Sequence, residues 1–205
     1  MLHNKVVIEI TNFKKFYHRQ CVLSIKKLSF YLGYTYLIVG ENGSGKSTLI
    51  KAIIGLIKYE GYIKKEDTYF SYLPERFPEF SLINVMTFLK LMKIDDNISD
   101  KIIYDLCDYF NLDYHKLISN LSKGNLQKVM IIQAIINNQK VMIFDEPLNG
   151  LDLDCQNKFL TLLKILKNNN RTIIITTHYP KYYVGIFDLV VSLKNGEVSE
   201  IKADY

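Results

Sequence analysis

The chain has few of the features that mark disulfide-rich, zinc-binding or highly charged proteins. Its only three cysteines, Cys21, Cys107 and Cys155, lie far apart and form no CxxC pair. We therefore expect neither a zinc site nor a disulfide framework, and reduced thiols in a cytosolic protein fit the pattern best. The net charge of +5 is mild. No block of roughly five or more like charges occurs, which favours a solvated surface over a basic face for anionic lipid or nucleic acid.

Long hydrophobic runs are also missing from the sequence. No apolar stretch approaches the ~20 residues that a bilayer-spanning helix needs. Residues 1–5 lead into a strand-like run without the charged, apolar and small-residue pattern of a signal peptide. We therefore expect a cytoplasmic protein that binds no nucleic acid. If it works at a membrane, another chain must supply the spans.

What the sequence does contain is the pattern of one folded α/β domain. Hydrophobic residues make up 48% of the chain and charged residues 23%, which is typical of a globular protein. Strand-like runs alternate with helical ones, and this order predicts a largely parallel sheet. The expected strands cover 6–10, 21–32, 36–39, 69–73, 141–144 and 172–176, with a hairpin over 189–201. The expected helices cover 46–57 and 155–166, and 82–136 reads as mainly helical.

A glycine-rich segment follows the strand predicted to end at Val39. Gly40–Ser47 matches the pattern GxxxxGK[ST], which predicts a loop that cradles the phosphates of a nucleotide. Glycines let the backbone amides wrap a dense anion, and the following helix adds its positive N-terminal end. Lys46 supplies a mobile charge for the outer phosphates, and the Ser47 hydroxyl is a Mg²⁺ ligand. The expected nucleotide contacts are Gly40, Glu41, Asn42, Gly43, Ser44, Gly45, Lys46, Ser47 and Thr48.

Two carboxylates follow a second buried strand, 141–144. Ligands of open α/β sheets bind at the carboxyl ends of the strands. Asp145 and Glu146 follow such a strand end, so we expect their carboxylates to contact the ligand. Asp145 is suited to hold Mg²⁺, directly or through water. Glu146 is suited to orient or deprotonate the water that attacks the outer phosphate.

Taken with further motifs along the chain, these two sites resemble those of the ATP-binding-cassette (ABC) ATPases, specifically the nucleotide-binding subunits of ABC transporters. The resemblance runs through nearly the whole chain in family order. The matching segments are Leu121-Ser122-Lys123-Gly124-Asn125 (the LSGGQ signature), Asn149-Gly150-Leu151-Asp152 (the D-loop), Thr177-His178 (the switch histidine), Tyr72-Leu73-Pro74-Glu75 (the glutamine loop) and Tyr17, an aromatic residue upstream of Gly40.

The resemblance implies a fold and a set of roles. The implied fold is a P-loop NTPase core with a mostly parallel sheet, an N-terminal antiparallel β part and an inserted helical subdomain over about 76–136, all in one domain of residues 1–205. The implied cofactors are ATP and Mg²⁺. Tyr17 would stack on adenine, and His178 would act with Lys46 and Glu146 in catalysis. The expected metal ligands are Ser47, Glu75 and Asp145.

The resemblance also implies that the site is shared between two chains. Two ATP molecules would be sandwiched between two copies, or between this chain and a paralogous subunit. The contacts made to the partner's ATP would come from Ser122, Lys123, Gly124, Asn125 and Asp152. The cycle would energise a multi-span permease from the inner face of the cell membrane, and an exporter is the expected type. The alternative is a soluble single-cassette ATPase of an assembly system, such as iron–sulfur cluster assembly.

Three positions depart from the family pattern. Glu75 stands where glutamine is usual, and a carboxylate is a good ligand for a hard cation. The Pro74-Glu75 form resembles that of many exporter subunits. Lys123 and Asn125 replace the usual glycine and glutamine of the signature. Residues 76–91 are rich in apolar and aromatic side chains, which indicates either a groove for a membrane subunit or the core of the helical subdomain.

Overall fold

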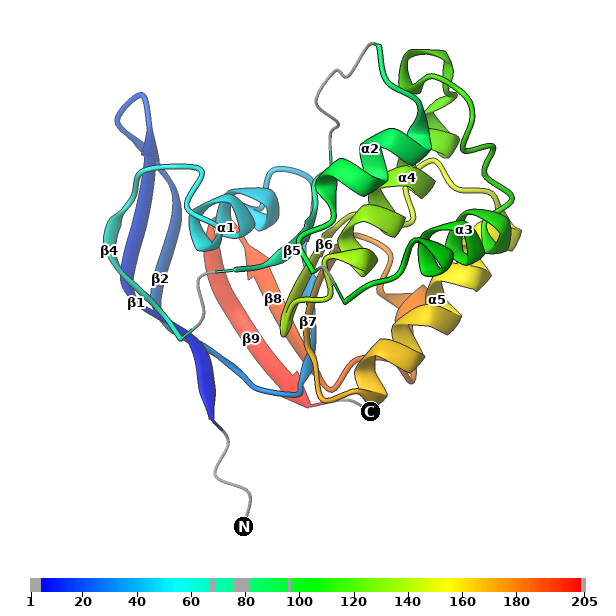
Figure 1. The fold of residues 1–205 in the computed structure, drawn as a ribbon. Helices are drawn as coiled ribbons and strands as arrows, with labels where there is room; N and C mark the ends of the chain where they lie inside the picture. Colours follow the sequence, from blue (N-terminus) through cyan, green and yellow to red (C-terminus); the bar gives the residue numbers. More distant parts are fainter. Residues whose placement is uncertain (1–4, 67–68, 76–81, 96, 204–205) are drawn as a thin grey trace.

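The computed structural model describes residues 5–66, 69–75, 82–95 and 97–203. Within these residues the chain forms one nine-stranded mixed sheet with helices on both faces (Figure 1). The strand order is β4-β1-β2-β9-β8-β3-β7-β6-β5. The strands are β1 (Val6–Tyr17), β2 (Gln20–Tyr31), β3 (Thr35–Val39), β4 (Glu60–Lys65), β5 (Ser71–Leu73), β6 (Val141–Asp145), β7 (Thr172–Thr177), β8 (Leu189–Lys194) and β9 (Glu197–Ala203).

The sheet has a parallel part and an antiparallel part, as the sequence predicts. Strands β5, β6, β7, β3 and β8 run parallel to one another, while β1 pairs antiparallel with both β2 and β4. The β8-β9 hairpin joins the two parts, because Glu197 of β9 pairs with Ser24 of β2. The carboxyl ends of the parallel strands meet at one edge of the sheet, where ligands of such folds bind.

The helices occupy the two faces unequally. They are α1 (Lys46–Ile53), α2 (Val85–Met92), α3 (Asp100–Tyr109), α4 (Lys123–Ile136) and α5 (Leu153–Asn168), with short 3₁₀ turns at Ile118–Asn120 and Pro180–Tyr183. Helices α2 to α5 pack on one side and α1 on the other (Figure 1). Alternate residues of the central strands face opposite cores, as strand geometry requires. Phe144 and Ile175 join the first core, and Ile143 and Ile174 join the second.

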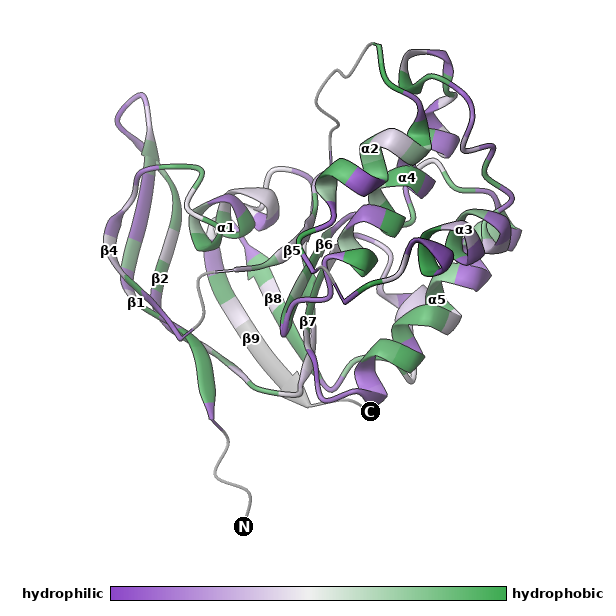
Figure 2. Cartoon of the chain, in the orientation of Figure 1, coloured by the Kyte–Doolittle hydropathy of each residue, from purple (hydrophilic) through white to green (hydrophobic). Residues whose placement is uncertain are grey.

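Figure 2 shows how this covering of the sheet by helices matches the hydropathy of the strands. Strand β6 is hydrophobic along most of its length, and β7 is hydrophobic over Ile173–Ile175, because helices cover both faces of these strands. The tip of the β1-β2 hairpin and strand β4 carry many hydrophilic residues, because this part of the sheet is half exposed.

The antiparallel part is larger than the sequence predicts. β1 runs on to Tyr17 instead of ending near Ile10, and it turns through His18 and Arg19, both with positive φ. Such a two-residue turn is usually marked by Asn-Gly or Asp-Gly, so this one gives no sequence signal. β4 was not predicted either, since an edge strand with one exposed face has little hydrophobic pattern. Helix α1 ends at Ile53, four residues earlier than the predicted end at 57. Gly55, two residues beyond Ile53, takes a φ of 84°, which does not continue a helix.

The segment between β5 and β6 contains α2, α3 and α4, in the position of the predicted helical subdomain of about 76–136. Residues 76–81, including Phe77 and Phe80, lie outside the described residues. Of the remaining apolar side chains, Val85 and Phe88 are buried in the core, whereas Leu82 and Leu91 are exposed. Val85 and Phe88 therefore belong to the core of the helical segment. A groove for a membrane subunit remains a prediction for Leu82 and Leu91.

Candidate functional site

The phosphate loop connects β3 to α1 and has the geometry that its glycines require. Gly45 caps α1 with a φ of 105°, a left-handed conformation that favours glycine. Gly40 lies so close to its neighbours that a Cβ there would be 2.4 Å from Ser44 Oγ and 2.5 Å from the Leu193 carbonyl oxygen. The positive φ of Gly45 and the close packing around Gly40 therefore explain why these two positions of the GxxxxGK pattern carry glycine.

Lys46 lies over this loop and is only 6% exposed. Its Nζ donates hydrogen bonds to the carbonyl oxygens of Gly40 (2.7 Å) and Glu41 (3.2 Å). It also lies 3.8 Å from Glu146 Oε1. A buried ammonium needs such partners. Its position places one positive charge between the loop and the acidic strand end.

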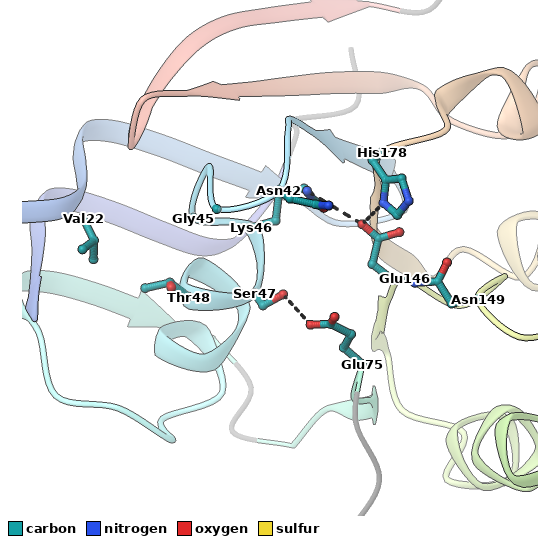
Figure 3. A pocket seen from close by; sticks show the side chains of 11 residues that line it. Val22, Asn42, Gly45, Lys46, Ser47, Thr48, Glu75, Glu146, Asn149 and His178 are labelled. Carbon is teal, nitrogen blue, oxygen red and sulfur yellow. Dashed lines mark hydrogen bonds and ion pairs between the residues drawn. The ribbon is translucent and has the colours of Figure 1, made fainter. Parts of the chain in front are cut away.

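A cavity of about 320 Å³ opens next to the loop (Figure 3). It collects side chains from the ends of four neighbouring parallel strands, β3, β5, β6 and β7, and from β2. The lining residues are Val22, Asn42, Gly43, Gly45, Lys46, Ser47, Thr48, Glu75, Glu146, Asn149 and His178. Apart from Val22 and Asn149, all of them were predicted as site residues. These residues lie far apart in the sequence, and the strand order brings them together at one cavity.

Asp145 lies at the carboxyl end of β6 and is fully buried. Its Oδ1 accepts hydrogen bonds from the hydroxyls of Ser47 (3.3 Å) and Thr176, while its Oδ2 has no partner among the described residues. Desolvation by burial raises the pKa of Asp145 despite these donors. A buried oxygen without a partner is costly, and a bound cation would supply one.

The residues around Asp145 fit Mg²⁺. Ser47 Oγ lies 3.5 Å from Glu75 Oε2, so a hydroxyl and two carboxylates face the same point. Oxygen ligands of this kind are those that Mg²⁺ takes in phosphate-binding sites. Glutamate in place of glutamine at Glu75 therefore keeps an oxygen donor at this position.

Glu146 is held in an unusual backbone conformation. Its φ is +50°, which is uncommon for a residue other than glycine. Its amide donates to the carbonyl oxygen (3.2 Å) and hydroxyl (3.0 Å) of Thr176 on the neighbouring strand. Its Oε1 lies 2.8 Å from Nδ1 of His178. The carboxylate thus stands between the imidazole and Lys46, at the wall of the cavity.

The signature segment forms the start of α4 and does not line this cavity. Ser122 caps the helix, and its Oγ accepts from the Asn125 amide at 3.3 Å. A Cβ on Gly124 would lie 2.7 Å from the Gly150 carbonyl oxygen, so the two glycines let the backbones meet closely. Lys123 is exposed, and its aliphatic stem runs beside Gly150.

Asp152 is an N-cap within its own chain. Its Oδ1 accepts from the Cys155 amide at 2.8 Å at the start of α5, and this hydrogen bond lowers the pKa of Asp152. Like the signature, it is not among the residues that line the cavity. The predicted contacts of these residues with a partner's ATP remain predictions.

Tyr17 is another predicted site residue that does not line the cavity. The residue is 45% exposed, and Lys15 Nζ lies 4.6 Å from its ring centroid. Val22, on the other strand of the same hairpin, lines the cavity instead. A single aliphatic residue in a strand carries no chemical signal, so sequence reasoning had no means of selecting it. The adenine-stacking role of Tyr17 stays a prediction.

This geometry agrees with what comparison with known proteins finds. A family model described as ABC transporter matches residues 23–149. The chain belongs to the ABC transporter family. It is an ABC ATPase, an ATP-binding and hydrolysing cassette, as the resemblance implied.

Individual members of the family show the extent of the similarity. An uncharacterized ABC transporter ATP-binding protein of Methanocaldococcus jannaschii is 31% identical over 201 residues, which cover 94% of this chain and 76% of that protein. A zinc import ATP-binding protein of Wigglesworthia glossinidia brevipalpis is 32% identical over 193 residues, covering 91% and 82%. A dimeric ATP-binding cassette, solved in a post-hydrolysis state with ADP and phosphate, superposes with a TM-score of 0.84 at 21% identity and covers 96% and 98%.

Among the helices of the described residues, none combines the length and the apolar character that a membrane span requires.

Proposed function

We propose that this ABC ATPase energises a multi-span membrane transporter by closing and opening as a pair of cassettes around two ATP molecules. The observation that carries the proposal is which of the sequence motifs line the nucleotide cavity. The loop, the acidic strand end and His178 line it, and the signature of the same chain does not. A second chain, identical or paralogous, would complete it.

The cavity residues support a division of labour in hydrolysis. Lys46 and the loop amides would bind the outer phosphates, as charge-assisted hydrogen bonds to an anion. Glu146 would accept a proton from the attacking water while His178, at 2.8 Å, orients the carboxylate and contacts the γ-phosphate. Ser47, Asp145 and Glu75 would hold Mg²⁺, which neutralises phosphate charge when bound.

The start of α4 supports the contribution of the second chain. An unobstructed helix N-terminus presents backbone amides and a positive dipole end. Ser122 and Asn125 define this end, and Ser122, Lys123 and Asp152 are exposed. In a pair of chains they would face the partner's γ-phosphate, and Asp152 would link the two sites.

The transport direction is the finer part of the proposal. The Pro74-Glu75 form of the glutamine loop favours an exporter, while zinc import proteins among the relatives are importers by name. We propose export, from a position on the inner face of the cell membrane. Measuring ATP-driven uptake and extrusion in the same inside-out vesicles distinguishes the two directions.

Co-purification from membranes tests the transporter role. The tagged chain is isolated with mild detergent from cells that express it at its natural level, and bound proteins are identified by mass spectrometry. A stoichiometric multi-span protein supports the proposal. An active ATPase that stays in the soluble fraction without such a partner would contradict it and favour a soluble assembly ATPase.

A further inference from the structure

One hydrogen bond ties α4 to the residue that follows Glu146. Gln127 Nε2 donates to the Pro147 carbonyl oxygen at 3.0 Å. Gln127 is only 8% exposed, and Pro147 is buried too. A buried carbonyl requires a donor. No role assigned so far uses this side chain, although it lies within one residue of the proposed catalytic base.

The accepting carbonyl belongs to the turn that shapes Glu146. The Asn149 amide donates to the Glu146 carbonyl oxygen at 3.2 Å, which closes a turn over 146–149. Glu146 sits at its start with a φ of +50°. A non-glycine residue keeps this conformation only where its surroundings enforce it. Thr176 on β7 fixes one side of the turn through the Glu146 amide, and Gln127 on α4 fixes the other.

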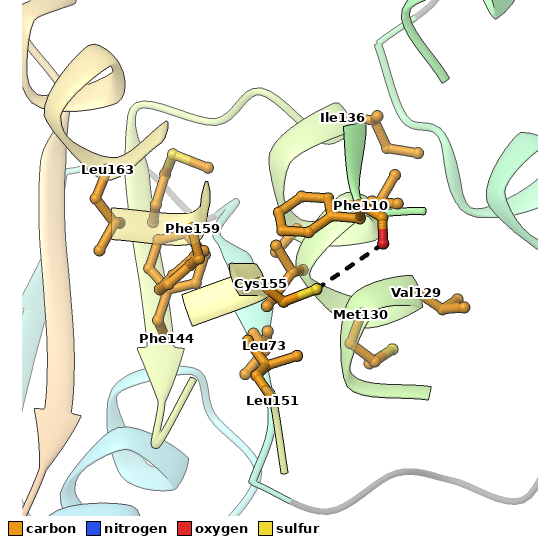
Figure 4. Close-up of a cluster of buried hydrophobic side chains, with 14 of the residues drawn as sticks. Leu73, Phe110, Val129, Met130, Ile136, Phe144, Leu151, Cys155, Phe159 and Leu163 are labelled. Atoms are coloured by element: carbon orange, nitrogen blue, oxygen red, sulfur yellow. Dashed lines mark hydrogen bonds between the residues drawn. The ribbon is translucent and has the colours of Figure 1, made fainter. Parts of the chain in front are cut away.

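Further contacts pack α4 closely against the loop that follows Glu146. Gly124 and Gly150 lie in close backbone approach. Met130 of α4 belongs to the same buried cluster as Leu151 and Cys155 (Figure 4). A shift of the loop would therefore move the start of α4, and a shift of α4 would reach the loop that carries Glu146.

We propose that Gln127 is a positioning residue for ATP hydrolysis. Its hydrogen bond to Pro147 holds the backbone of Glu146 in the conformation that aims the carboxylate into the cavity, and it ties this residue to the helix that carries the signature. Gln127 itself touches neither nucleotide nor water. The proposal rests on the role of Glu146 in the proposed function.

Two substitutions at Gln127 separate positioning from packing. Gln127→Leu keeps the size and removes the donor. We expect kcat to fall about 10- to 100-fold, because small displacements of a catalytic group cost this much, while KM for ATP changes by less than about threefold, because Lys46 and the loop are untouched. Gln133, another buried glutamine of the same helix at 6% exposure, provides the matched control Gln133→Leu.

A pH profile gives a readout that a merely structural role would not move. In Gln127→Glu, the introduced carboxyl donates to the Pro147 carbonyl only when protonated, and burial raises its pKa above the ordinary value. The ratio of its kcat to that of the wild type should therefore rise as pH falls from about 8 to about 6. The corresponding ratio for Gln133→Glu should stay flat.

The proposal is overturned by any of three results. These are a wild-type kcat in Gln127→Leu, an equal loss in Gln133→Leu, or a flat pH ratio in Gln127→Glu. Should the leucine variant fail to fold, the pH ratio decides alone. Full turnover in Glu146→Gln would remove the proposed base, and this inference with it. Loss of turnover in Glu146→Gln together with normal Gln127 variants would overturn this inference only.

Discussion

At the scale of single residues, the chemistry depends on buried charges that the fold holds close together. Lys46 and Glu146 are both more than nine-tenths buried and lie 3.8 Å apart. Two such charges are stable in the interior only because each has further partners, the loop carbonyls for Lys46 and His178 for Glu146. Binding of a triphosphate would exchange these partners for phosphate oxygens.

Replacing Lys46 tests the nucleotide contact. We expect Lys46→Ala to weaken ATP binding about 10- to 100-fold, since charge-assisted hydrogen bonds contribute ~1.5–3 kcal/mol. Titration calorimetry measures this affinity directly. The control is Lys51→Ala, because Lys51 lies in the last turn of the same helix, exposed to solvent. An ATP affinity equal to that of the wild type would contradict the assignment of Lys46.

Replacing Glu146 tests its proposed role as the base that accepts a proton from the attacking water. Gln has the same shape as Glu but accepts no proton, so Glu146→Gln should lower kcat by about 10²- to 10⁴-fold and leave ATP binding intact. Phosphate release measured at saturating ATP gives kcat, and Glu60→Gln on the exposed edge strand β4 is the control. Retained turnover in Glu146→Gln would exclude Glu146 from this role.

At the scale of elements, function is concentrated where helices begin and parallel strands end. The sequence marked most of these points correctly, because buried strands and glycine turns leave clear patterns. It missed β4 and the length of β1, since edge strands and a His18-Arg19 turn carry weak signals. It also could not reveal that α4 packs against the 147–152 loop, a contact between segments that sequence order keeps apart.

Gly124 tests this contact between elements. A Cβ there would lie 2.7 Å from a backbone oxygen that cannot move freely. Gly124→Ala should therefore displace the start of α4 or the loop, and overpacking of this kind costs ~1–3 kcal/mol. We expect turnover to fall about tenfold or more with little change in ATP affinity, because the phosphate loop belongs to another element. Unfolding curves and phosphate release measured on the same sample check both effects, and wild-type values of both would refute the prediction.

At the scale of the whole molecule, the proposed pair requires each chain to carry two half-sites at separate places. The phosphate loop and the acidic strand end would form one, and the start of α4 would form the other. A head-to-tail pair would close both at once, with ATP as part of the interface. Occupancy of the site and association of the chains would then be linked by mass action.

Association of the chains therefore should depend on ATP. With Mg²⁺ and ATP, Glu146→Gln should shift from the 23.9 kDa of one chain to twice this mass, because the trapped nucleotide holds the interface closed. Light scattering after size exclusion measures the mass. The double variant that adds Lys46→Ala should remain a monomer. A single-chain mass for Glu146→Gln at saturating ATP would argue against the closed pair.

The sequence by itself determined the phosphate loop, the acidic strand end and the family. These features are local, since each depends on residue types at fixed short spacing, such as Gly40 and Gly45 around the loop. Only the tertiary structure decided which of them meet. Strand order brings Glu75, Glu146 and His178 to one edge of the sheet and places Val22, not Tyr17, at the cavity. Pairing of distant strands and docking of α4 fix these contacts, and neither is encoded in local spacing.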